Sequence, residues 1–456
     1  MLAEDLRQSA GKIGYRTIVE AVSLAVSRGK LLPGQRLPPQ RDLAQDIGVA
    51  VATVGRAYAE LEARGILTSH VGRGTFVSTG PRRALPATAE EGPVDLATYR
   101  APVPREGDAL ARLMRAMAGD RALPDILAEA PTGGLPRHRE AIAAWMGRCG
   151  LAIDPGAVVI TNGGQHAVMA ALAAIAAPGA IATEELTDPR MKAVAHFLRR
   201  PLTGLACDAE GPLPDHLDHL CRRERVAALY CTPRNQNPTN VTLPLARREA
   251  LVAVARRHDL PIIESGIYAT LTADPLTALT ALAPERTFHL SSFGRIAGAG
   301  IKVGWLVAPP GTLERARIGL AMTTGAASPF MVEMATRWVR DGQMEEMAAW
   351  QRAENERRLA MVAARPRLSA ARGHATSAHV WLDLPEPWRA EDFVEAAAAQ
   401  DVAIAPSHSF VVGRRLVPHS VRLVIGAPAS RDLLARACDR LEALLAAPPP
   451  LGRTSG

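Results

Sequence analysis

The chain has 456 residues, of which 48% are hydrophobic and 22% are charged, so it is long enough for two or three domains with a large core. It carries no signal-peptide pattern and no apolar run near the roughly 18 residues that span a bilayer, which predicts a soluble, cytoplasmic protein without membrane contact. The net charge of +7 is compatible with a polyanionic partner, and five scattered cysteines without a C-x-x-C pair argue against a metal site or a disulfide framework.

The first 78 residues carry short helical and strand patterns in close succession. Apolar residues recur at helical spacing in three segments, and Gly48 marks the end of the second. The order of helix, helix, turn, helix and hairpin predicts a winged helix-turn-helix domain over residues 1–78. The predicted elements are helices over 18–25, 38–48 and 52–64 and strands over 66–70 and 75–77.

Three motifs in this region resemble the GntR class of bacterial repressors. Residues 29–44 match G-x-L-x-P-G-x-x-L-P-x-x-R-x-L-A, residues 53–61 match T-V-x-x-A-Y-x-x-L, and residues 72–77 match G-x-G-T-F-V. The resemblance implies that the start of the third helix and the wing contact double-stranded DNA, where arginine binds phosphates or guanine edges and glycine lets the backbone approach the sugar-phosphate. The implied DNA-binding residues are Arg41, Ala50, Val51, Ala52, Thr53, Arg56, Gly72, Arg73 and Gly74.

Two features of this interface depart from the pattern or stay open. Ala50 and Val51 stand where Ser-Arg is usual, so one polar contact is absent and Val51 is left to touch a thymine methyl group. For Arg56, a solvated helix face is as good an explanation as a DNA contact.

A larger α/β body follows the winged helix. Residues 79–93 are rich in Pro, Ala and Gly without a period, which predicts an interdomain linker. Beyond it, helical segments alternate with short apolar runs, which predicts a mostly parallel sheet whose carboxyl edge binds ligands. We assign residues 94–446 to this body and 447–456 to a disordered tail. The predicted strands include 158–160, 227–230 and 261–263, and the predicted helices include 167–177 and 245–258.

A small-residue loop over 291–305, between apolar runs at 287–290 and 303–307, carries hydroxyls and two cations that suit an anion. The stretch resembles the lysine-bearing segment of fold-type I pyridoxal-phosphate (PLP) aminotransferases. The resemblance places Ser292 at the phosphate and Lys302 where the phosphate-binding arginine is usual. It also places Arg295 at the position of the catalytic lysine, and a guanidinium stays protonated and cannot form the aldimine.

Other matches to these enzymes lie at predicted strand ends. The turn at 161–166 precedes a helix, and its Gly163, Gly164 and Gln165 are implied to hold the phosphate at the helix N-terminus. Asn237 matches the residue that bonds the cofactor 3-oxygen. Arg422 matches the arginine that clamps a substrate carboxylate, with a structural salt bridge as the alternative. Residues 376–446 resemble the smaller α+β domain of the aminotransferase fold.

Two further departures concern the cofactor ring. The family has an acidic residue three positions before a tyrosine, and here Ser265 precedes Tyr268, so nothing stabilises a protonated pyridine nitrogen. Residues 187–189 (Thr-Asp-Pro) stand where an aromatic residue and a proline are usual, so the stacking ring is absent too. Together with Arg295, these changes predict that transamination is lost and that no residue is catalytic.

The whole chain resembles the MocR subfamily of GntR-type transcriptional regulators, in which a winged helix is fused to a fold-type I aminotransferase-like body. The resemblance implies a head-to-tail homodimer that binds an operator with two half-sites and responds to an amino-acid-like effector. Because of Arg295, we expect a regulator that senses a small carboxylate, amino-acid-like or phosphorylated ligand without covalent PLP.

Three alternatives stay open. The protein could still bind PLP, either noncovalently or through Lys302. It could be a residual PLP-dependent enzyme with a vestigial DNA-binding domain, which the loss of the lysine argues against. It could also be a DNA-binding scaffold whose body only dimerises and binds no ligand.

Overall fold

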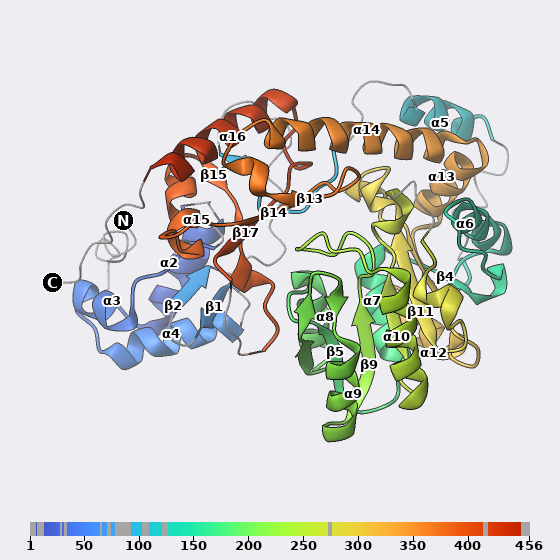
Figure 1. Ribbon diagram of the computed structural model, residues 1–456, viewed down its shortest axis with the longest axis horizontal. Helices are drawn as coiled ribbons and strands as arrows, with labels where there is room; N and C mark the ends of the chain where they lie inside the picture. Colours follow the sequence, from blue (N-terminus) through green and yellow to red (C-terminus); the bar gives the residue numbers. More distant parts are fainter. Residues whose placement is uncertain are drawn as a thin grey trace.

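The computed structural model describes residues 6, 13–27, 30–31, 34–63, 66–70, 74–77, 93–102, 109–120, 126, 128, 130–271, 276–413 and 418–447 (Figure 1). Residues 79–92 of the predicted linker, residues 448–456 of the predicted tail, and Gly72 and Arg73 of the predicted wing lie outside this description.

The N-terminal part forms the predicted winged helix-turn-helix. A buried cluster that includes Ile18, Leu43 and Leu61 joins its three helices. The second helix ends at Gly48, whose left-handed backbone (φ 69°) lets its N–H bond the last carbonyls. The elements are α2 (Tyr15–Ser27), α3 (Gln40–Ile47), α4 (Val51–Ala63) and the antiparallel strands β1 (Leu67–His70) and β2 (Gly74–Val77).

A seven-stranded sheet forms the centre of the large domain. Neighbouring residues of its strands serve opposite faces, so Val159 packs into one hydrophobic core and Val158 and Ile160 into another. In sheet order the strands are β4 (Val158–Thr161), β12 (Gly304–Val307), β11 (Thr287–Ser292), β10 (Ile262–Ser265), β9 (Val226–Cys231), β5 (Ala180–Glu184) and β6 (Leu202–Leu205).

The pairing is parallel from β11 to β6, as predicted, but β12 runs antiparallel to both of its neighbours. β12 returns beside β11 because only a short loop, residues 293–303, joins them. The first predicted strand, β4, therefore pairs in an antiparallel manner and not in the expected parallel one.

Helices cover both faces of the sheet (Figure 1). The helix predicted over 167–177 begins and ends three residues earlier, and the one predicted over 245–258 is found almost unchanged. The helices of the large domain are α6 (Pro136–Arg148), α7 (Gly164–Ala174), α8 (Pro189–Phe197), α9 (Pro214–Arg223), α10 (Leu245–Arg257), α11 (Leu279–Leu282), α12 (Leu313–Ala321) and α13 (Pro329–Arg340), with α5 (Ala109–Ala118) beyond them. No helix in the described ranges is both long and apolar enough to cross a bilayer.

The small domain follows the long helix α14 (Gln343–Ala363) and lies between the large domain and the winged helix (Figure 1). Its four-stranded sheet has the order β13 (Arg372–Gly373), β14 (Val380–Asp383), β17 (Ser420–Leu423) and β16 (Ala405–Pro406). It is larger than the predicted segment 376–446, because β3 (Val94–Asp95) pairs in parallel with β15 (Val402–Ala403). The helices α15 (Ala390–Ala399) and α16 (Arg431–Ala446) complete it.

Candidate functional site

The turn between β4 and α7 forms one wall of the candidate site. Gly163 has a positive φ of 85°, which directs the chain into α7 so that the first free N–H groups of the helix open toward the site. Gly304 lies against this turn, and a Cβ built on it would come within 2.6 Å of the carbonyl carbon of Gly163. The close approach of β12 therefore requires glycine at this position.

The loop between β11 and β12 forms the opposite wall. The hydroxyl of Ser292 lies 3.5 Å from the point where a Cβ on Gly164 would stand, so it is adjacent to the helix N-terminus. Lys302, in left-handed conformation (φ 49°), has its backbone near Gly163 and its side chain exposed. A helix N-terminus, a hydroxyl and an ammonium group are the kinds of group that bind phosphates in proteins.

Arg295 lies in the short helix η4 (Phe293–Arg295) and is buried. Its guanidinium carbon is 3.7 Å from the ring centroid of Tyr99 and 5.8 Å from that of Tyr268. Burial lowers the pKa of Arg295, and the neighbouring Arg190 lowers it further. Within the described ranges, Arg295 makes no ion pair with a carboxylate.

A chain of polar contacts runs behind Arg295. Arg190 donates to Asp188 over 2.8 Å, Asn237 donates to the same carboxylate over 3.0 Å, and Arg422 donates to the Asn237 amide oxygen over 2.9 Å. Burial would raise the pKa of Asp188, but the charge and hydrogen bonds of Arg190 and the charge of Arg295 together outweigh burial and hold this pKa well below its usual range. Burial lowers the pKa of Arg422 to about 10, and this arginine also donates to the carbonyl of Ala97 over 2.5 Å.

A cavity of about 170 Å³ opens between these walls, enough for on the order of ten water molecules. Three positively charged side chains line it, those of Arg190, Arg295 and Lys302. Asp188 contributes one carboxylate to the same lining. The residues predicted from sequence that line this cavity are Gly163, Gly164, Gln165, Ser292, Arg295 and Lys302.

The other four predicted site residues lie around the cavity and do not line it. Ser265 hydrogen-bonds the hydroxyl of Tyr230, and Asn237 joins Arg422 to Asp188. The Tyr268 hydroxyl and the Arg422 Nε are buried without a hydrogen-bond partner in the described ranges.

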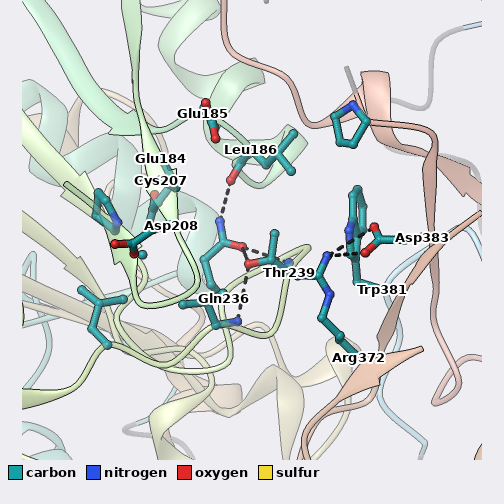
Figure 2. Close-up of a pocket in the computed structure, with 15 residues that line it drawn as sticks. Glu184, Glu185, Leu186, Cys207, Asp208, Gln236, Thr239, Arg372, Trp381 and Asp383 are labelled. Atoms are coloured by element: carbon teal, nitrogen blue, oxygen red, sulfur yellow. Dashed lines mark hydrogen bonds and ion pairs between the residues drawn. The ribbon is translucent and has the colours of Figure 1, made fainter. Parts of the chain in front are cut away.

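A second cavity of about 160 Å³ lies at the boundary of the large and small domains (Figure 2). Its polar groups are largely paired within the protein. Gln236 donates to the Leu186 carbonyl and accepts from Thr239, while Arg372 pairs with Asp383 on the small-domain side (Figure 2). The first cavity, with its excess of positive charge, is therefore the better candidate for binding an ionic ligand.

Most of the predicted DNA-contacting residues that the structure describes are exposed on the winged helix. Arg41 is exposed on α3, and Val51 and Ala52 are exposed in the first turn of α4, next to Ala50. Further along α4, Arg56 is exposed with its guanidinium carbon 4.1 Å from the Tyr15 ring centroid. Thr53 is half-buried in the same turn and donates its N–H to the Ala50 carbonyl. Gly74, at the described edge of the wing, has φ 105°.

Sequence reasoning missed Tyr99, Arg190 and Arg36. Tyr99 belongs to no motif, and Arg190 follows the Thr-Asp-Pro departure by one residue. Arg36 is exposed beside the wing, where a Cβ on Gly74 would lie 2.9 Å from its Nε. For Arg36, the sequence offered one signal of a DNA contact, namely a basic residue within the motif that precedes the third helix.

No cluster of three or more His, Cys, Asp or Glu side chains in the described part of the chain could hold a metal ion. The five cysteines are free thiols.

Comparison with known families gives two matches that together cover most of the chain. Residues 14–77 match the model of bacterial regulatory proteins of the gntR family, and residues 94–441 match aminotransferase class I and II. The chain is 26% identical to the HTH-type transcriptional regulator YdeF of Bacillus subtilis (strain 168), over 94% of each chain. It is 30% identical to the HTH-type pyridoxine biosynthesis transcriptional regulator PdxR of Corynebacterium glutamicum, over 64% of this chain and 65% of that one.

Among solved structures, an archaeal alanine:glyoxylate aminotransferase superposes with a TM-score of 0.70 at 21% identity, covering 87% of this chain and 95% of that one. At this identity the likeness shows the fold, so the predicted aminotransferase fold behind a GntR-type domain is confirmed.

Proposed function

This chain belongs to the aminotransferase class I and II family and carries a gntR-family domain ahead of that region, and from that premise we propose that it is a bacterial transcription regulator whose body binds a small anionic ligand without a covalent bond. Two relatives are named HTH-type transcriptional regulators. The exposed surface of α3 and α4 supports DNA binding.

The buried Arg295 carries the proposal of noncovalent binding. Its guanidinium lies on Tyr99 at the cavity wall, within a segment that resembles the lysine-bearing segment of PLP aminotransferases. A guanidinium cannot act as the amine that bonds an aldehyde. The cation there has a fixed charge, which attracts an anionic group but performs no proton transfer at physiological pH.

The surrounding residues fit the phosphate of PLP but not the chemistry of its ring. The helix N-terminus at Gly164, the Ser292 hydroxyl and Lys302 suit a phosphate. Ser265, however, has no carboxylate that could pair with a protonated pyridine nitrogen, and its hydroxyl is hydrogen-bonded to Tyr230. Glu264 is no substitute, because it accepts hydrogen bonds from the N–H groups of Leu279 and Thr280. We therefore propose that the body is not an enzyme.

The charge balance of the cavity supports a ligand with more than one acidic group. Arg190, Arg295 and Lys302 line it with only Asp188 in opposition, which leaves two positive charges in excess. Arg295 is buried without a carboxylate partner, which is costly, and Lys302 adds an exposed charge, so an anion that enters this cavity gains most if it contacts both cations. A phosphorylated small molecule with a second acidic group, such as a carboxylate, fits this requirement.

Thermal unfolding of the full chain with inorganic phosphate and with PLP tests this proposal. Both compounds should raise the Tm, because a ligand bound only by the native state stabilises it by about 2.7 kcal/mol at 100 times its Kd. The shift should shrink in Arg295→Met and persist in the remote variant Arg223→Met. After borohydride treatment, mass spectrometry should find no adduct on the wild-type chain with PLP.

An adduct on Lys302 would contradict noncovalent binding and support the alternative in which PLP bonds this exposed lysine, which lines the same cavity. Turnover of amino acids with added PLP would contradict the proposal that the body is not an enzyme. Loss of every Tm response would leave the DNA-binding scaffold as the better explanation. We also propose that the full chain forms a head-to-tail homodimer, which binds an operator with two half-sites. Analytical ultracentrifugation with operator fragments can test this assembly.

A further inference from the structure

One short segment of the small domain, residues 405–412, contacts the winged helix at one end and the large domain at the other. It comprises β16, the 3-10 helix η7 (Ser407–Ser409) and the three residues after it. We refer to it as the coupling segment.

At its first end, the coupling segment packs against the strand that leads out of the wing. The rings of His408 and Phe76 have centroids 4.8 Å apart, and both side chains are buried. A Cβ on Gly34 would lie only 3.3 Å from the Pro406 ring. Gly34 and β2 are themselves joined, because the Gly34 N–H donates to the Val77 carbonyl. A displacement of His408 therefore acts directly on the base of the wing.

The middle of the segment is attached to Arg422. Ala405 pairs with Arg422 in the sheet, and the Arg422 guanidinium lies 4.8 Å from the ring centroid of Phe410. The Phe410 ring also packs edge-to-face on Trp381, with centroids 5.9 Å apart. Arg422 thus links the polar chain behind Arg295 to the segment that touches the winged helix.

At its other end, the coupling segment is bonded to the large domain next to the ligand cavity. Thr187 donates its N–H to the Phe410 carbonyl over 2.9 Å, and Lys192 donates to the Ser409 carbonyl over 2.9 Å. Thr187 directly precedes Asp188, which lines the cavity with Arg190. These bonds connect residues on either side of the cavity-lining pair to two consecutive carbonyls of the segment.

We propose that the coupling segment carries the occupancy of the ligand cavity to the winged helix through the His408–Phe76 contact. An anion bound beside Arg190 and Arg295 changes the forces on residues 187–192, and the two hydrogen bonds pass a shift of these residues to Ser409 and Phe410. His408 is the next residue back along the chain and lies on Phe76. The inference rests on the proposed function, since it requires that the cavity binds a ligand.

The neighbouring cavity favours such a movement. The second cavity, which Leu186 of the large domain and Trp381 of the small domain line, separates the two domains there, so they are not close-packed at this point (Figure 2). A shift of one domain against the other is therefore opposed there by few packed side chains. Coupling between the cavity and the winged helix calls for a direct measurement at both sites.

Hydrogen–deuterium exchange of the full chain provides it. We expect saturating PLP, and separately saturating inorganic phosphate, to slow exchange at least about twofold in the two segments next to the coupling segment, residues 34–37 and 74–77. The slowing should disappear in His408→Ala, while the ligand-induced Tm shift persists. His408→Phe keeps a ring at this position and should retain the slowing. His374→Ala, which removes an exposed imidazole from the same domain, is the matched control.

A second variant guards against simple detachment of the winged helix. Lys192→Met removes the hydrogen bond to the Ser409 carbonyl at the large-domain end of the coupling segment, away from Phe76. This variant should also abolish the ligand-induced slowing of exchange at residues 34–37 and 74–77. If neither compound raises the Tm, the proposed ligand site is wrong. If the Tm rises but wild-type exchange at 34–37 and 74–77 is unchanged, or if His408→Ala and Lys192→Met still respond, the coupling is wrong and the ligand site stands.

Discussion

The guanidinium carbon of Arg295 lies 3.7 Å from the ring centroid of Tyr99, although nearly 200 residues separate the two in sequence. The guanidinium carbons of Arg422 and Arg190 also lie near this ring, at 5.8 Å and 6.0 Å from its centroid. An aromatic face attracts cations, so Tyr99 offsets part of the repulsion among three arginines of which Arg190 pairs with Asp188. The ring thereby holds the three positive charges close together.

Replacing this ring should weaken ligand binding. Tyr99→Leu removes the cation–π contact, and we expect the affinity for PLP or phosphate to fall by about 0.5–2 kcal/mol. Tyr99→Phe keeps the ring face and should bind nearly as the wild type does. Isothermal titration calorimetry measures both. Equal loss in the two variants would show that the hydroxyl, and not the ring face, matters.

Restoring an amine at position 295 should restore covalent capture of PLP. In Arg295→Lys, we expect borohydride treatment to fix an adduct on residue 295, visible by peptide mass spectrometry, while the wild type gives none. Turnover should still be absent, because Ser265 supplies no carboxylate to the ring nitrogen. An adduct on Lys302 in both proteins would show that the exposed lysine captures PLP without help from residue 295.

Removing Arg41 should weaken DNA binding. Arg41 is exposed on α3, and Arg41→Ala should cost about 1–3 kcal/mol at a given salt concentration if the side chain contacts a base edge. If it contacts a phosphate, the slope of log affinity against log salt should fall by about 1 instead. Fluorescence anisotropy on the promoter next to the gene distinguishes the two. Arg223→Ala removes the same charge from exposed surface of the large domain and should leave affinity unchanged.

The buried His379 should make folding stability depend on pH. Burial lowers its pKa to about 3, and the charge of Arg422 contributes. Between about pH 6.5, where an unfolded histidine titrates, and about pH 3, the unfolded chain binds a proton that the folded chain excludes. The free energy of unfolding should therefore fall as pH falls through this window, by up to about 1.4 kcal/mol per pH unit from this residue.

Urea unfolding at about pH 7.5 and about pH 5 measures this dependence. In His379→Gln, part of the pH dependence should vanish, whereas the exposed control His419→Gln should keep it. Parallel curves for the wild type and His379→Gln would show that this residue binds protons equally in the folded and unfolded chains, so that folding does not lower its pKa.

The winged helix and most of the sheet could be predicted because their signals are local. Helical spacing of apolar residues, the glycine at position 48 and short apolar runs define these elements within a few residues. The antiparallel pairing of β4 could not be predicted in this way. A strand buried on both faces has the same continuous apolar pattern whichever way its neighbour runs.

The candidate site was predictable only where it consists of motifs. The turn at 161–166 and the loop at 291–305 are local patterns, and both line the cavity. Tyr99 and Arg190 were missed because their roles depend on contacts between distant segments. The bond from Arg422 to the Ala97 carbonyl, for example, spans 325 residues and brings the segment of Tyr99 to the site.

The pairing of β3 with β15 has a practical consequence for exchanging DNA specificities. The polypeptide that leaves the N-terminal domain enters the body through a strand of the small domain, and that domain also bears His408. A DNA-binding domain from another regulator, joined at residue 93, would thus be tethered beside the surface that touches Phe76 in the native chain. Such a chimera should respond to the ligand of the native body only if the wing of the new domain presents an aromatic side chain to His408.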